Sequence, residues 1–177
     1  GVRSAMPTIQ AMRLCPQLIL VPPDRPLYQR LHRQLQDITD RFFPETEWTS
    51  IDEFYADTTR LQTRHPDPRE LGQALKIDIT RVTGLTCTIA LASGKTVAKI
   101  AADAHKPDGL AVIEPGSEAA FLAPLPIRSL PGMGPKSTEA IERLGIHTVG
   151  DLLEPRFEQS LIRLLGSRLA ASPTQRE

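Results

Sequence analysis

The sequence changes character near Pro124–Pro126, and this change restricts the possible folds more than any other feature. Upstream, amphipathic helical patterns alternate with short apolar stretches. Downstream, only short helical patterns remain, divided by Gly and Pro. Helices alternating with strands indicate a sheet covered by helices, whereas short helices without strands indicate a small helical domain. We therefore predict an α+β fold, with a mixed helix-and-sheet part followed by an all-helical part.

Apolar residues three or four positions apart mark the helices of the first part. The predicted helices cover residues 4–16, 24–43, 67–83 and 93–105. Ser4, Asp24 and Ser93 stand where an N-cap is expected, and each side-chain oxygen could accept from a backbone N–H of the first turn. The helix over 24–43 has the clearest pattern of all.

Apolar, aromatic and Thr-rich runs between these helices predict strands. The predicted strands cover residues 18–23, 46–59, 85–92 and 109–115. The run over 85–92 is mostly apolar, so we expect it to be buried on both faces. In the second part, short helices are predicted over residues 117–125, 135–145, 148–154 and 156–166. The last eight residues, 170–177, are expected to be frayed or truncated.

Composition excludes several classes of protein. The 177 residues carry 21 basic and 21 acidic side chains, so any nucleic-acid-binding surface must be local. Cys15 and Cys87 are far apart and belong to no Cys-x-x-Cys motif, which argues against a disulfide framework and a zinc site. No signal peptide and no apolar run of about 18 residues is found. We expect a cytoplasmic protein without a membrane span.

The segment Ser-Gly-Lys-Thr at residues 93–96 is similar to the end of a phosphate-binding P-loop. Such a loop needs another glycine five residues before Gly94, but Ile89 stands there. The motif therefore predicts a turn from a strand into a helix. Lys95 and Lys99, four residues apart, lie on one face of that helix. They could serve a site, or they could be ordinary solvated lysines.

An acidic pair, Asp52 and Glu53, lies within the predicted strand over 46–59. On a regular strand the two side chains would point to opposite faces. At a hairpin tip or a kink both could point to one place. With a third carboxylate they would suit Mg²⁺, which binds a few carboxylates and leaves room for substrate phosphates. The alternative interpretation is an exposed acidic turn.

The stretch Pro-Gly-Met-Gly-Pro-Lys, residues 131–136, precedes an amphipathic helix and predicts a helix-hairpin-helix element. Gly132 and Gly134 permit a tight turn between two helices. The N–H groups at the start of the second helix could hold a DNA phosphate, and Lys136 adds positive charge there. Such contacts read the DNA backbone and not the base sequence. A plain helix–loop–helix connector is the alternative.

Taken in order, four segments resemble the Y-family translesion DNA polymerases, and most of all the bacterial DNA polymerase IV (DinB/UmuC) type. These segments are GVRSAMP, SIDEFYAD, TIALASGKTVAKIAADAHKPDG and LPGMGPKSTEAIERLGIHTVGDL. The resemblance implies part of a fingers domain over residues 1–22 and a polymerase palm, a mixed sheet with helices, over 23–124. A partial thumb with the helix-hairpin-helix element would follow over 125–177.

The resemblance also implies roles for individual residues. Asp52 and Glu53 match two of the three palm carboxylates that hold two Mg²⁺ ions in the complete family site. Lys106, in Lys-Pro-Asp-Gly, matches the lysine that contacts the triphosphate of the incoming nucleotide. Gly94 stands where the family usually has Asn, but Lys95 is retained. The resemblance assigns nucleotide contacts also to Arg3 and Ser4, and DNA contacts to Lys95, Gly132, Gly134, Lys136 and Ser137.

The implied activity is template-directed nucleotidyl transfer in translesion synthesis, with primer–template DNA and dNTP as partners. The family's third metal carboxylate, steric-gate aromatic residue and Tyr/Arg pair would all precede Gly1. We therefore expect a palm without its first strand, a chain truncated at both ends, and weak or no activity of this chain alone. A sliding clamp would bind through a C-terminal segment beyond Glu177.

Two other functions remain open. A non-catalytic relative could act as a DNA-repair accessory protein that binds DNA or a partner. The retained Asp52, Glu53 and Lys106 argue for an enzyme, since such a relative has no chemical need for them. A free-standing DNA-binding module that uses only the glycine hairpin would leave the long first part unexplained.

Overall fold

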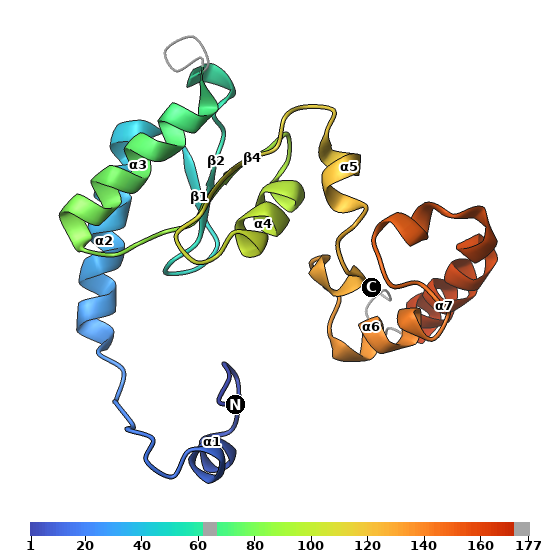
Figure 1. The fold of residues 1–177 in the computed structure, drawn as a ribbon. Coiled ribbons are helices and arrows are strands. Elements are labelled where there is room, and N and C mark those ends of the chain that lie inside the picture. The colour runs from blue at the N-terminus through green and yellow to red at the C-terminus, as the bar shows by residue number, and fades with distance from the viewer. Residues whose placement is uncertain (62–66, 172–177) are drawn as a thin grey trace.

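The computed structural model describes residues 1–61 and 67–171. A mixed part with four short strands lies at the upper left of Figure 1, and a helical part, residues 116–171, lies to its right. The N-terminal helix stands apart from both, connected by an extended segment (Figure 1). No helix in the described ranges is long and apolar enough to cross a bilayer.

Near the N-terminus two predictions are wrong. The first helix, α1 (Thr8–Leu14), begins after Pro7 and not at Ser4, which lies in a turn. The predicted strand over residues 18–23 is an extended segment whose Ile19 is 84% exposed and therefore packs on almost nothing. Two prolines at its end lack the N–H that a ladder needs, and within the described residues no strand pairs with it.

Two long helices form one wall of the mixed part, as predicted. Helix α2 (Arg25–Phe42) begins where the Asp24 carboxylate accepts the N–H of Leu27 at 2.9 Å. Helix α3 (Pro68–Thr83) is capped by Asp67 and ends at Gly84. The two helices pack against each other, and their apolar faces meet the strands in one core. The buried residues of this core are Ile38, Phe43, Leu71, Leu75 and Ile79.

The predicted strand over residues 46–59 is a hairpin. Its arms, β1 (Thr46–Trp48) and β2 (Phe54–Ala56), pair antiparallel, with Trp48 opposite Phe54. His32 of α2 stacks edge-on against Trp48, with ring centroids 4.6 Å apart. The hairpin is thereby held on α2, and residues 49–53 form its tip.

A second pair of strands is parallel. Strand β3 (Ile89–Leu91) continues through helix α4 (Lys95–Ala104) to β4 (Leu110–Val112). Strand β3 was predicted to be buried on both faces. This prediction is wrong, because all residues of β3 are only half-buried. Among the described strands, it pairs along one edge only, with β4. The two sheets are therefore separate two-stranded ladders over one shared core.

The N-cap of helix α4 lies one residue after the predicted cap, Ser93. Gly94 is the N-cap and gives no side-chain hydrogen bond. The hydroxyl of Ser93, predicted to cap, instead donates to the carboxylate of Glu118. The predicted turn from strand into helix is otherwise correct.

The helical part has its own core, formed by Ile127, Ile141, Ile146 and Phe157. Its elements are α5 (Glu118–Leu122), η2 (Ile127–Ser129), α6 (Pro135–Glu142), η3 (Gly150–Leu153), η4 (Pro155–Phe157) and α7 (Glu158–Ala171). In the mixed part, a 3-10 turn, η1 (Thr59–Leu61), follows the β1–β2 hairpin. The predicted helix over 148–154 is thus a 3-10 helix. Of the tail predicted to fray, residues 172–177 lie outside the described ranges.

Asp151 ties the helical part together at η3 and should make it sensitive to acid. Its carboxylate accepts the backbone N–H groups of Thr148 and His147, each at 2.8 Å. These bonds lower the pKa of Asp151 below its usual 3.8. A lowered pKa contributes stability above the usual value, and this contribution is lost as the pH falls through the lowered pKa.

We therefore expect Asp151→Asn to destabilise the helical part at neutral pH and to reduce its further loss of stability below about pH 4. The methyl resonances of Ile127 and Ile146 would follow unfolding during acid titration. Asp40→Asn, an exposed position on α2, is the control and should leave this titration unchanged. A parent-like acid transition in Asp151→Asn would contradict the role of the two hydrogen bonds.

Candidate active site

The acidic pair lies at the tip of the β1–β2 hairpin. The backbone N–H groups of Thr49 and Ser50 donate to the Glu53 carbonyl at 3.0 and 3.3 Å, which closes the tip. The Ser50 hydroxyl donates to the Asp52 carboxylate at 2.6 Å. His32 Nδ1 lies 2.9 Å from the carbonyl oxygen of Ile51, which makes Nδ1 the donor. The tip is thus fixed to α2, and the two acids lie at a hairpin tip, one of the arrangements that the sequence left open.

A chain of ion pairs runs from this tip along α4. Lys99 pairs with the Glu53 carboxylate and lies 3.7 Å from Asp103. Asp103 in turn pairs with Lys106 at 2.7 Å. The hydrogen bond to Glu53 raises the pKa of Lys99, helped by Asp103 and opposed by partial burial. The structure therefore brings Glu53 and Lys106 into one network of alternating charge.

Lys95, one turn before Lys99, reaches the same hairpin. Its ammonium pairs with Glu47 of β1 and lies 5.5 Å from the centroid of the Tyr55 ring. Lys95 and Lys99 therefore share a helix face as predicted, and both form ion pairs with the hairpin. The predicted contact of Lys95 with DNA stays a prediction.

The donor set at the tip suits a hard divalent cation. Asp52 and Glu53 offer carboxylate oxygens, the ligands that Mg²⁺ takes in proteins. Asp52 is exposed and Glu53 half-buried, so both can be reached from solvent. In the part of the chain that the structure describes, no group of three or more His, Cys, Asp or Glu residues forms a complete cation site. The tip therefore offers two carboxylates, and their role as metal ligands stays a prediction.

Arg3 and Ser4 are not brought to this network. Both lie in the exposed N-terminal segment, where the N–H of Met6 donates to the Arg3 carbonyl at 3.2 Å. No hydrogen bond or ion pair recorded among the described residues joins them to the acidic tip or to Lys106. Their predicted nucleotide contacts stay predictions.

The glycine hairpin has the predicted turn. Gly132 has φ of 85°, a conformation that favours glycine, and Gly134 is the N-cap of α6. The N–H groups of Ser137 and Thr138 both donate to the Gly134 carbonyl at 2.9 Å, so these two are already used. Lys136 is exposed at the second position of the helix, where an α-helix offers its N–H no carbonyl partner.

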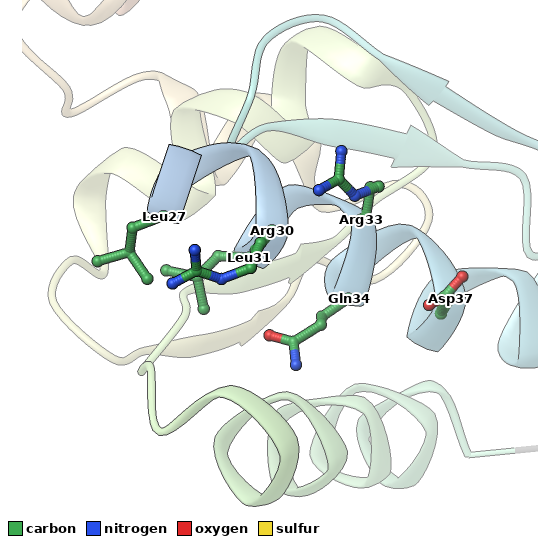
Figure 2. A pocket seen from close by; sticks show the side chains of 6 residues that line it. All are labelled: Leu27, Arg30, Leu31, Arg33, Gln34 and Asp37. Carbon is green, nitrogen blue, oxygen red and sulfur yellow. The ribbon is translucent and has the colours of Figure 1, made fainter. Parts of the chain in front are cut away.

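The described surface also has two shallow hollows. The first follows one face of α2, and none of the predicted site residues lines it (Figure 2). Its side chains are those of Leu27, Arg30, Leu31, Arg33, Gln34 and Asp37. The second lies between α4 and η2 and includes Asp103 and Arg128. The second hollow thus adjoins the chain of ion pairs.

Sequence reasoning missed Asp103 and the anchoring His32. The spacing did contain a signal for Asp103, since it follows Lys99 by four residues and precedes Lys106 by three. On the predicted helix over 93–105, Lys99 and Asp103 lie on one face. His32 gave no local signal, because its partners lie in the hairpin tip.

The fold, the acidic hairpin tip and the glycine hairpin together point to one class of protein. The chain belongs to the impB/mucB/samB family, whose model matches residues 1–103. A second model, described as the IMS family HHH motif, matches residues 115–146 and confirms the predicted helix-hairpin-helix element.

Named relatives make the class more specific. A DNA polymerase IV of Methanoculleus marisnigri is 40% identical over 164 residues, 93% of this chain and 45% of that protein. A DNA polymerase IV of Streptomyces coelicolor is 42% identical over 168 residues, 94% of this chain and 35% of that protein. A crystal structure of DinB from Sulfolobus solfataricus matches with a TM-score of 0.85 and 32% identity, covering 97% of this chain and 50% of that one.

These similarities confirm the resemblance to Y-family polymerases of the DNA polymerase IV type, and with it the fold class. The chain spans between 35% and 50% of the length of the three proteins.

Proposed function

We propose that this chain contributes the palm and part of the thumb of a Y-family DNA polymerase and acts in translesion synthesis by template-directed nucleotidyl transfer. Residues 1–22 would be part of the fingers, residues 23–124 the palm without its first strand, and residues 125–177 part of the thumb with the helix-hairpin-helix element. The names of the relatives support this proposal. The observation that carries it is the chain of ion pairs from Glu53 through Lys99 and Asp103 to Lys106.

In the reaction, the 3′-hydroxyl of a primer attacks the α-phosphate of a dNTP, and pyrophosphate leaves. Asp52 and Glu53 would hold two Mg²⁺ ions, which when bound stabilise the charge that develops on the attacking and leaving oxygens. Lys106 would leave Asp103 and pair with the triphosphate. Lys99 would exchange its carboxylate partner, since it then competes with a cation for Glu53.

Arg3 and Ser4 are proposed to meet the nucleotide from the fingers side. On the thumb side, primer–template DNA is the proposed partner of Gly132, Gly134, Lys136 and Ser137, and Lys95 is proposed to contact DNA from the palm. These contacts would be made to phosphates and would be independent of base sequence. Exposure of Lys136 at the start of α6 supports this assignment.

Incorporation of a dNTP on a primer–template, measured with and without Mg²⁺, tests the proposal. Mg²⁺-dependent extension that is lost in Asp52→Ala supports an enzyme. Because this chain alone is expected to extend weakly or not at all, absence of extension is not decisive by itself. DNA binding without extension, together with Mn²⁺ binding that is unchanged in Asp52→Ala, would instead support a non-catalytic DNA-repair accessory protein.

Charge reversal at the thumb should weaken DNA binding without altering base preference. We expect Lys136→Glu to lower duplex affinity about tenfold at low salt and to reduce the slope of log affinity against log salt by about one. Fluorescence anisotropy with two duplexes of different sequence measures both effects.

Arg41→Glu is the matched control for this experiment, because Arg41 lies on α2 and pairs with Asp78 of α3. Arg41→Glu changes the net charge by the same amount, at a position distant in sequence from the proposed thumb. A binding curve that does not move in Lys136→Glu, or one that moves equally in the control, would contradict the phosphate contact.

A further inference from the structure

Lys76 of α3 is a nearly buried lysine whose ammonium is surrounded by oxygen atoms. Its side chain is only 12% exposed. The ammonium donates to the carboxylate of Asp108 at 2.5 Å and to the carbonyls of Asp108 and Gly109 at 3.0 and 3.3 Å. It also donates to the carbonyl of Cys87. A lysine is rarely buried unless it is paired in this way.

These acceptors belong to two segments that are distant in sequence. Cys87 lies just before β3, and the other acceptors lie in the turn from Lys106 to Gly109 between α4 and β4. Asp108 has φ of 52°, a left-handed conformation that few residues other than glycine adopt. The contacts with Lys76 compensate for that cost. Lys76 therefore fastens the turn to the start of the neighbouring strand.

The same turn carries Lys106, two residues before Asp108. The Lys106 side chain is 54% exposed and pairs with Asp103 at 2.7 Å. A lysine stem is flexible, so the backbone of the turn sets only the region that the Lys106 ammonium can reach. Apart from the Lys76 contacts, the turn is attached to β3 through Gly109, whose N–H donates to Thr88 and whose carbonyl accepts from Ile89. The region that Lys106 can reach thus depends on the clamp, that is, on the Lys76 contacts that hold the turn.

We propose that Lys76 is a positioning residue for nucleotide binding, which holds the Lys106–Gly109 turn so that Lys106 points to the triphosphate. This inference rests on the proposed function, because it takes Lys106 as the phosphate ligand. Lys76 lies on a different helix from the ion-pair chain, and none of its described contacts is to the acidic tip. Removing its side chain would therefore affect nucleotide binding only through Lys106.

Hydrogen exchange of the free chain tests the clamp itself, without any nucleotide. In Lys76→Met the amides between residues 106 and 110 should exchange about tenfold faster than in the parent. Lys76→Arg keeps the charge and the donors, and should restore part of the protection. Arg81→Met is the matched control, since Arg81 lies on the same helix and pairs with Asp78. Unchanged exchange in Lys76→Met would overturn the clamp.

Binding of a fluorescent dATP analogue with Mg²⁺ tests the action through Lys106. We expect Lys76→Met to weaken binding about tenfold in the parent, but less than about twofold in a Lys106→Ala background. Lys76→Arg should recover most of the affinity. An equal loss in both backgrounds, or no loss in the parent, would show that Lys76 does not act by positioning Lys106.

The two experiments separate the failure of this inference from that of the proposed function. If the parent does not bind the analogue, or binds it equally after Lys106→Ala, the proposed role of Lys106 is wrong, and positioning for the nucleotide falls with it. The exchange data then still decide whether Lys76 holds the turn. If Lys76→Met does not fold, Asp108→Asn is the substitute variant for both experiments. It removes the charged partner of Lys76, and asparagine adopts the left-handed backbone conformation readily.

Discussion

Asp52→Asn should lower the rate of Mg²⁺-dependent nucleotide incorporation by about a hundredfold or more from the weak parent rate expected of this chain, because the proposed cation loses one of its carboxylate ligands. The fold should be unaffected, since Asp52 is exposed and its carboxylate contacts only Ser50 among the hydrogen bonds described. Single-turnover primer extension measures the rate. Binding of Mn²⁺, followed by its electron paramagnetic resonance signal, measures the loss of the ligand directly.

The matched control is Asp57→Asn, one residue beyond β2 on the same hairpin. Asp57 is exposed, and its carboxylate accepts the backbone N–H of Thr59 at 2.8 Å. This change removes the same charge close to the tip and should alter the rate by less than about twofold. Extension by Asp52→Asn at the parent rate, or an equal loss in the control, would refute a specific ligand role for Asp52.

The long helices could be predicted from sequence to within one or two residues. In α2, apolar residues repeat with the helical period, and Asp24 marks the start. Gly84 supplies the left-handed residue that ends α3, with φ of 72°. Period and caps are local properties, so no tertiary information is needed.

The segment over residues 18–23 shows where local patterns fail. A short apolar run looks like a strand, but a strand also needs a neighbour that supplies hydrogen bonds. The described residues provide none there, and Val21 is left 80% exposed. The same limit explains why β3 was expected to be more buried than it is.

The sequence predicted which residues belong to the candidate site, but it did not predict the ion pairs that join them. Asp52, Glu53 and Lys106 could be selected by motif. The pairing of Glu53 with Lys99 joins positions 46 apart in sequence and depends on how α4 packs on the hairpin. The clamp made by Lys76 depends likewise on α3 lying beside the turn before β4. Ion pairs between separate helices and strands depend on how these elements pack. A residue pattern within one segment of the sequence does not reveal that packing.

Gly109→Ala should destabilise the chain by about 3 kcal/mol and displace the turn that carries Lys106. A Cβ at this position would lie 2.1 Å from the His105 carbonyl oxygen and 2.7 Å from the His105 Cβ. The nearest obstacle is backbone at the end of α4, so it cannot move aside like the tip of a flexible side chain. Either the helix end or the start of β4 must shift.

Gly94→Ser, at the other end of the same helix, is the matched control for this substitution. A Cβ on Gly94 would meet no atom within 4 Å, and its φ of −160° suits any residue. Serine also supplies the side-chain cap that α4 lacks, so a gain of a few tenths of a kcal/mol is expected. Urea unfolding followed by Trp48 fluorescence compares both variants with the parent. Because the clash at Gly109 involves backbone, an unchanged urea midpoint in Gly109→Ala would mean that the His105 carbonyl does not approach the turn as closely as the structure places it.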